Sequence, residues 1–143
     1  MAYSTLADIL EQIGEATLID LTDDTMSGKI NVAVVARAVE GADALINGFC
    51  QGRYNLPFLP VPKLARSFSV DLALFNLYSR RPHLEVPSVI QHRHSEALAY
   101  LRRVQTGEAP MGPDAEPVHA GGGQSGLMPG NPRLFNRNTL QGM

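Results

Sequence analysis

The sequence predicts an all-α protein, namely a small helical bundle of three long helices plus a short N-terminal helix, followed by an extended C-terminal arm. In four segments of residues 4–106, apolar residues recur three and four positions apart, which is the period of an amphipathic helix. The alternating pattern of a β-strand is poorly represented. In residues 107–143 this periodicity is lost, and Gly and Pro fill 13 of 37 positions. These observations favour helices first and an irregular segment last.

The first helix is expected to begin after Thr5 and to be short. Thr5 and Asp8 are spaced as an N-cap and its reciprocal partner, an approximate capping box. Gly14 is expected to end the segment. The stretch 15–23 that follows supplies further apolar core candidates. The apolar residues of the first segment are Leu6, Ile9, Leu10 and Ile13.

Two long helices are predicted in the middle of the chain, over residues 32–54 and 63–80. Asn31 is a favourable N-cap for the first of them. Three prolines then force an extended link, because proline and the residue before it resist helix formation. Pro82 ends the second. The link prolines are Pro57, Pro60 and Pro62, and the stripe of the second helix is Leu64, Phe68, Leu72, Phe75 and Tyr78.

The fourth helix is expected to begin at Pro87, since proline is tolerated in the first turn. Arg102 and Arg103 lie near its end, where positive charge suits the helix dipole. Its apolar face is Ile90, His94, Ala97, Leu101 and Val104.

Asp71 is predicted to have a structural role, because it lies at the edge of the apolar stripe of the third helix. A carboxylate in that position needs a partner, or it takes up a proton. Arg53 is the nearest base in the link, so we expect Asp71 to be buried near the junction of the second and third helices and to accept hydrogen bonds from Arg53. Loss of one member of a buried pair costs about 3–5 kcal/mol.

The composition places a domain boundary at about Gly107, with a helical domain over residues 1–107 and a Gly/Pro-rich arm over residues 108–143. Residues 108–132 have few large apolar groups and are expected to be an extended spacer. Residues 133–140 are expected to be its anchor on a partner, because Phe and Arg dominate small interfaces. The predicted partner-binding residues are Arg133, Leu134, Phe135, Arg137 and Leu140.

The formal charge of −2 excludes a strongly basic coat for nucleic acid, but the charges are unevenly distributed. Residues 1–50 hold eight acids and two bases, whereas residues 51–143 hold ten bases and six acids. An acidic end and a basic end suit head-to-tail contacts between copies of the chain. An uneven spread of solvated charges with no such role is the alternative.

Residues with catalytic potential are few. Cys50 lies on an apolar helix face and is expected to be an inert packing thiol, and His92 and His94 point to different faces of a helix, so they do not chelate one metal together. The acidic loop at 20–31 suggests calcium, but Asn31 stands where an EF-hand has its bidentate Glu. We therefore expect no enzyme, no cofactor and no metal site. No apolar run approaches the length that spans a bilayer, so no membrane partner is expected.

The chain resembles a known family in several motifs over residues 1–109. RYNLP at 53–57 followed by VP at 61–62 is the most specific, and SVDLALFNLYSRR is the next. The opening MAYSTLADILEQIGEATLIDLTD and the closing PRLFNRNTLQGM are also similar. These motifs resemble those of the small neck proteins of Mu-like phages and prophages, which are related in fold to the head–tail connectors of other long-tailed phages.

This resemblance implies a structural role in the virion neck, after assembly in the host cytoplasm. Such connectors form a ring of about twelve copies under the portal protein, by contacts between unlike sides of each subunit. The ring continues the channel for double-stranded DNA, without sequence specificity, and supports the next neck or tail-terminator protein. The termini or arms of such connectors clasp the portal.

Two other classes of function remain open from the sequence. One is a DNA-binding or packaging-associated helical protein, which the basic second half of the chain supports. The other is a small enzyme, which is disfavoured because no set of acid, base and nucleophile can be assembled from the sequence.

Overall fold

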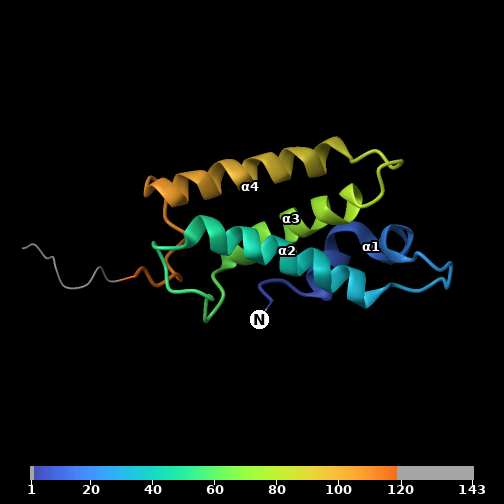
Figure 1. Cartoon of the computed structure of the whole chain (residues 1–143), viewed down its shortest axis with the longest axis horizontal. Coiled ribbons are helices and arrows are strands. Elements are labelled where there is room, and N and C mark those ends of the chain that lie inside the picture. The colour runs from blue at the N-terminus through green and yellow to red at the C-terminus, as the bar shows by residue number, and fades with distance from the viewer. Residues whose placement is uncertain (1, 119–143) are drawn as a thin grey trace, which may run out of the picture.

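A computed structural model describes residues 2–118 of the chain, and their fold is all-α, as predicted (Figure 1). The predicted partner-binding residues Arg133, Leu134, Phe135, Arg137 and Leu140 lie outside the described residues. The helices are α1 (Leu6–Thr22), α2 (Val32–Cys50), α3 (Lys63–Ser79) and α4 (Ser88–Thr106).

The helices α2 and α3 form the centre of the bundle, where they pack along each other. α4 lies along both of them, and α1 packs on both of them from a different side (Figure 1). The pair of α2 and α3 is therefore covered by α4 and by α1.

α1 confirms the predicted start and the predicted break, but it continues beyond the break. The hydroxyl of Thr5 accepts the Asp8 N–H, and the Asp8 carboxylate accepts the Thr5 N–H, so both halves of the capping box form. Gly14 has φ of 75°, which interrupts the helix in a conformation that glycine adopts at little cost. The chain then resumes a helical course to Thr22, because Leu18 and Leu21 bury their side chains in the core.

The remaining helices begin where the sequence predicts, within one residue. The side chain of Asn31 caps α2 by accepting from the N–H groups of Ala33 and Val34. α2 ends at Cys50 rather than at 54, and the N–H groups of Arg53 and Tyr54 both donate to the Cys50 carbonyl. α4 ends in a left-handed residue, Gly107, with φ of 85°.

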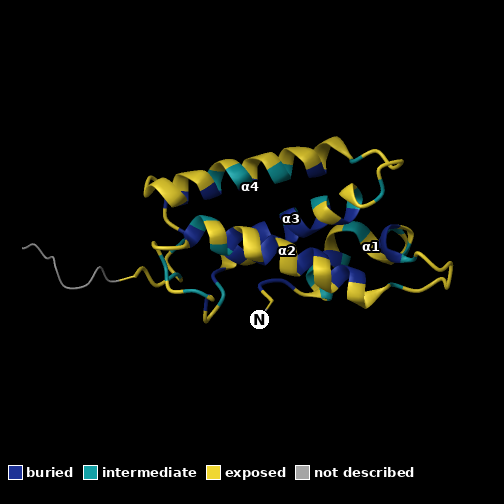
Figure 2. Ribbon diagram, viewed as in Figure 1, coloured by how far each residue is buried: buried dark blue, intermediate teal, exposed yellow. Residues whose placement is uncertain are grey.

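The core lies between the inward faces of all four helices, and the outward faces are exposed (Figure 2). The predicted apolar stripe of α4 is confirmed, since its aliphatic members are all buried and His94 is half-buried. In the part of the chain described, no helix has both the length and the hydropathy needed to cross a bilayer.

The residues that follow α4 contact the helical domain. Met111 is fully buried, and its N–H donates to the hydroxyl of Tyr54 at 2.8 Å. Val118 donates its N–H to the carbonyl of Arg53. The expectation of an extended spacer from residue 108 onward is therefore wrong for residues 108–118, because Met111 and Ala109 give this segment apolar side chains to bury.

Candidate functional site

A buried polar network joins the N-terminal segment to α2 and α3. The Asp43 carboxylate on α2 accepts the backbone N–H of Tyr3 at 2.8 Å and the Ser69 hydroxyl at 2.6 Å. The hydroxyls of Ser69 and Ser4 are 2.8 Å apart. Asp43, Ser4 and Ser69 are all buried, and burial raises the pKa of the Asp43 carboxyl above its usual value.

The ring of Tyr3 extends this network toward the proline-rich link. Its hydroxyl donates to the side chain of Asn47 and accepts the N–H of Phe58. The Tyr3 and Phe58 rings lie 5.6 Å apart, and the Phe58 and Tyr54 rings lie 5.8 Å apart. The N-terminal segment is therefore held by hydrogen bonds and aromatic contacts at once.

The sequence analysis did not identify this network. Asp43 lies between Val39 and Ile46 on the apolar stripe of α2, which is the same signal that singled out Asp71. Applied to α2, that signal would have identified Asp43. Its partners Tyr3 and Ser69 have no such signal, because their contacts are made across 40 and 26 positions of the chain.

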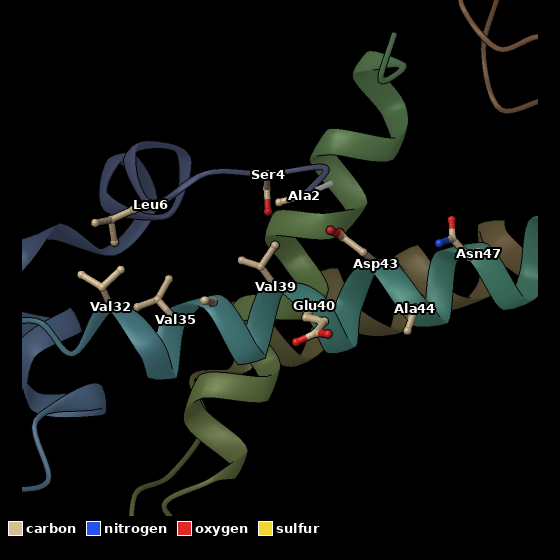
Figure 3. A pocket seen from close by; sticks show the side chains of 11 residues that line it. Ala2, Ser4, Leu6, Val32, Val35, Val39, Glu40, Asp43, Ala44 and Asn47 are labelled. Atoms are coloured by element: carbon tan, nitrogen blue, oxygen red, sulfur yellow. The ribbon is translucent and has the colours of Figure 1, made fainter. Parts of the chain in front are cut away.

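A groove of about 480 Å³ opens beside the network, between the N-terminal segment and α2 (Figure 3). Its walls are mostly apolar, and Glu40 is the exposed charge on them. Val32, at the start of α2, is 59% exposed. Small apolar side chains therefore face solvent here without a partner in the described residues. The lining residues of α2 are Val32, Val35, Ala36, Val39, Glu40, Asp43, Ala44 and Asn47.

The predicted pair of Asp71 and Arg53 is not formed. Asp71 lies midway along α3 and faces α4, where Arg93 Nη2 is 2.5 Å from its Oδ1. Arg93 also donates to the side chain of Gln12 on α1. Burial raises the pKa of the Asp71 carboxyl, and the positive charge of Arg93 opposes that rise. The expected need for a partner is correct, but the partner comes from α4, because α3 and α4 run antiparallel and bring Arg93 opposite Asp71.

Arg53 instead ties the link to the end of α4. Its Nε donates to the carbonyl of Gln105, and its guanidinium lies against Gly107. A Cβ on Gly107 would lie 3.0 Å from Nη1 of Arg53, and the left-handed backbone there also favours glycine. Arg53 therefore has a structural position, but a different one from that predicted.

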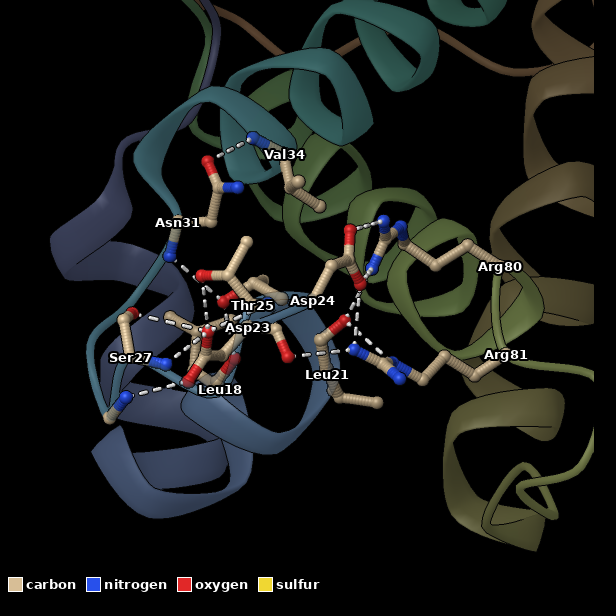
Figure 4. A network of polar contacts seen from close by, with 12 residues as sticks. Leu18, Leu21, Asp23, Asp24, Thr25, Ser27, Asn31, Val34, Arg80 and Arg81 are labelled. Atoms are coloured by element: carbon tan, nitrogen blue, oxygen red, sulfur yellow. Dashed lines mark hydrogen bonds and ion pairs between the residues drawn. The ribbon is translucent and has the colours of Figure 1, made fainter.

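The acidic loop after α1 is organised by its own polar groups (Figure 4). The Asp23 carboxylate accepts the backbone N–H groups of Ser27 and Gly28, and these bonds lower its pKa from 3.8 to about 2. Arg80 and Arg81 both pair with Asp24, at 2.7 and 2.8 Å. Among residues 2–118, no group of three or more His, Cys, Asp or Glu residues is placed to hold a metal ion. Asp23 therefore stabilises the loop itself, and Asp24 joins the loop to the end of α3.

Cys50 and His94, which the sequence analysis considered as candidate functional residues, both pack against other side chains. Cys50 is fully buried, and burial raises the pKa of its thiol to about 11. The His94 ring stacks on Phe75 with centroids 3.8 Å apart, and burial lowers its pKa. Both groups are therefore neutral near pH 7.

The first two helices and the last two differ in the sign of their charge. α1 and α2 carry six acids and one base, whereas α3 and α4 carry five bases and two acids. The ion pairs of Arg80 and Arg81 with Asp24 join the end of α3 to the loop after α1. Arg93 pairs with Asp71 of α3, and Arg103 pairs with Glu108 in the segment after α4.

Comparison with known proteins identifies the chain at the level of its family. The model of the family described as Bacteriophage Mu, Gp36 matches residues 3–128, a range that includes all four helices. The chain is also similar to Gene product J of Escherichia phage Mu, with 24% identity over 139 residues that cover 96% of each chain. The predicted resemblance to proteins of Mu-like phages is confirmed, and the chain belongs to the Bacteriophage Mu Gp36 family.

Proposed function

We propose that this protein is a structural head–tail connector of a tailed bacteriophage. In this proposal about twelve copies form a ring below the portal protein, a number set by the portal. The ring continues the channel through which double-stranded DNA passes without sequence specificity, and it supports the next neck or tail-terminator protein. The protein is located in the virion neck, after assembly in the host cytoplasm, and it has no catalytic role.

The observation that carries this proposal is the match of residues 3–128 to a phage Mu protein family. The opposite net charges of the first two helices and the last two support it, because a closed ring needs two different surfaces that complement each other on every subunit. The neutral, packed states of Cys50 and His94 are also those of groups with structural roles.

The C-terminal arm, residues 108–143, is proposed to bind a partner. Residues 108–118 lie against the helical domain, and Val118 lies close to the link at Arg53. Residues 133–140 carry the Arg, Leu and Phe side chains that suit a small interface, and we propose that they dock on the portal or on an adjacent subunit.

Electron microscopy of phage necks that carry a labelled copy of this subunit tests the ring. A ring of the labelled subunit between portal and tail is expected, and necks without it would overturn the proposal. Deletion of residues 127–143 tests the arm separately. We expect unchanged thermal unfolding of the helical domain and loss of incorporation into necks, whereas infectious particles with the truncated chain would show that the arm is dispensable.

A DNA-binding role is the second candidate, because five of the seven charged residues of α3 and α4 are bases. Affinity of the whole chain for duplex DNA, measured against salt concentration, separates the two functions. A DNA-binding protein loses affinity steeply as salt rises, because phosphate contacts release counterions. For a connector that only surrounds DNA, we expect weak binding at every salt concentration.

A further inference from the structure

The groove between the N-terminal segment and α2 has apolar walls that no other part of the described chain covers. Val32, Val35 and Val39 lie on the side of α2 that faces the N-terminal segment (Figure 3). Val32 is 59% exposed, although valine is usually buried. Ala36 and Ala44 are exposed on the same helix, and their short side chains leave open space beside it. The groove therefore suits a ligand with large apolar side chains.

The charge on this groove is acidic. Its lining residues include Glu40 and Asp43 but no Lys, Arg or His. Asp43 is held by hydrogen bonds within the chain, whereas Glu40 is exposed and forms no ion pair within residues 2–118. The groove therefore favours a ligand that carries positive charge beside its apolar side chains.

The C-terminal end of the same chain has this composition. Residues 119–143 contain two Arg and no Asp, Glu or Lys. Both of these bases, Arg133 and Arg137, lie in the anchor segment, residues 133–140, and so does Phe135, the one phenylalanine of residues 119–143. The anchor segment therefore complements the groove in charge and in apolar content.

The anchor segment is also long enough in its connection to reach the groove of its own chain. The N–H of Val118 donates to the carbonyl of Arg53, so the described chain ends beside the C-terminal end of α2. Glu40 lies ten residues before Cys50, the last residue of α2, which is about 15 Å along the helix axis. Residues 119–132, which connect Val118 to the anchor segment, can span up to about 46 Å.

We infer that residues 133–140 bind the groove between the N-terminal segment and α2 of the same chain when no partner is present. Phe135 enters the apolar part of the groove, and Arg137 pairs with Glu40. The occupant comes from the same chain because a short tether gives a local concentration of about millimolar, above that of a separate copy in dilute solution.

The consequence for assembly rests on the proposed function. The portal or an adjacent subunit competes with the groove for the anchor segment, so the free chain keeps its docking residues covered. The contact involves few side chains, and its ion pair is exposed to solvent. It is therefore expected to open well below the unfolding temperature of the helical domain, which leaves the thermal unfolding of the chain without residues 127–143 unchanged.

Methyl NMR spectra of the full chain test the contact, because an aromatic ring shifts the signals of methyl groups beside it. Phe135→Ala removes the ring, and we expect the methyl signals of Val32 and Val39 to shift while those of the buried Val104 on α4 stay in place. Leu127→Ala is the matched control. Leu127 is an apolar residue of the same region without a base within four positions, so its loss should leave the groove signals unchanged.

Charge exchange tests the ion pair of Glu40 with Arg137. The quantity compared is the shift of the Val32 signal that Phe135→Ala causes in each background. Glu40→Arg should reduce this shift, because like charges then meet, and the further change Arg137→Glu should restore it. Circular dichroism of every variant checks that the helices remain folded.

A mixing experiment distinguishes the same chain from a second copy. Isotope-labelled Phe135→Ala chain is mixed with an equal concentration of unlabelled wild-type chain. We expect the labelled groove signals to stay where they are, because each wild-type anchor segment occupies its own groove. Return of these signals to their wild-type positions would overturn the inference, since the groove would then bind the anchor segment of another copy.

The inference is also overturned if Phe135→Ala leaves the Val32 and Val39 signals unchanged, or if Leu127→Ala moves them equally. Such a result leaves the proposed connector intact, because micrographs of necks report the ring independently of the groove. Absence of the ring from necks would instead overturn the proposed function, while a contact measured in the isolated chain would stand.

Discussion

Asp43 on α2 and Asp71 on α3 occupy equivalent places in the sequence, each at the edge of an apolar helical stripe, but their surroundings differ. Asp43 lies beside the N-terminal segment and is bound by neutral donors, the Tyr3 N–H and the Ser69 hydroxyl. Asp71 lies at the contact of α3 with α4 and is bound by the charged side chain of Arg93.

Asp43 and Asp71 show two different ways in which a carboxylate can be held within a core. The neutral network holds Asp43 at short distances on both oxygens and excludes water, with Asp43 only 7% exposed. The Arg93 side chain is 35% exposed, so water screens part of the ion pair at Asp71. A carboxylate on an apolar stripe therefore predicts a partner, but both the kind of partner and its energetic value depend on the packing around it.

The largest effect is expected from Asp43→Ala. The change leaves the Tyr3 N–H and the Ser69 hydroxyl without their acceptor in a buried site, and hydrogen bonds to a charged group contribute about 1.5–3 kcal/mol each. We expect a loss of about 3 kcal/mol in the free energy of unfolding, measured by urea denaturation. Asp43→Asn keeps an acceptor and should lose less. A variant that unfolds at the wild-type urea concentration would show that the network contributes nothing.

A smaller loss, about 1–2 kcal/mol, is expected from Asp71→Ala, because Arg93 then turns to water and to Gln12. This is below the 3–5 kcal/mol expected for a fully buried pair, since the true partner is partly exposed. A double-mutant cycle with Arg93→Gln measures the coupling between the two side chains, and a cycle with Arg53→Gln is the matched control. Coupling of Asp71 to Arg53 as strong as that to Arg93 would contradict the structure.

The smallest effect concerns pH and extends the comparison to the loop after α1. The folded-state pKa of Asp23 is lowered from 3.8 to about 2, so its contribution to stability is complete above pH 3.8 and is lost as pH falls toward 2. Burial raises the pKa values of Asp43 and Asp71, so their ionisation costs stability near neutral pH, and that cost is relieved as pH falls through their raised values.

Carboxyl carbon chemical shifts followed against pH measure these three groups separately. Asp43 and Asp71 should titrate above the usual value for aspartate, and Asp23 well below it. Asp23→Ala should flatten the acid limb of the stability curve between pH 3.8 and 2. A similar midpoint for all three carboxyls would show that their surroundings do not differ as described.

Much of the helical domain was predictable from the sequence, and the reasons are local. The Thr5 capping box, the Asn31 N-cap and the apolar stripe of α4 act within one or two helical turns, so the residues that cause them are adjacent in the sequence. The end of α2 at Cys50 was less predictable, because an apolar periodicity continues past the point at which the chain turns into the proline-rich link.

The candidate surfaces were predictable only in part. The acidic first third of the chain and its basic remainder are visible in the sequence, and they indicated contacts between copies. Where these charges lie in space depends on the packing of the helices, in which α1 and α4 each contact both α2 and α3. The groove beside Glu40 is likewise formed by the N-terminal segment lying across α2, an arrangement without a sequence motif.

By itself, the sequence determined the helical class, the starts of the helices and the requirement that Asp71 have a partner. Only the tertiary structure decided that the partner is Arg93, that Arg53 binds the end of α4 and that Met111 is buried against the link. The physical reason is the distance along the sequence between the residues that interact. Helical periodicity and capping depend on neighbours within a few residues, whereas the contacts of Arg53 and Tyr54 span more than fifty positions and form only after the helices have packed.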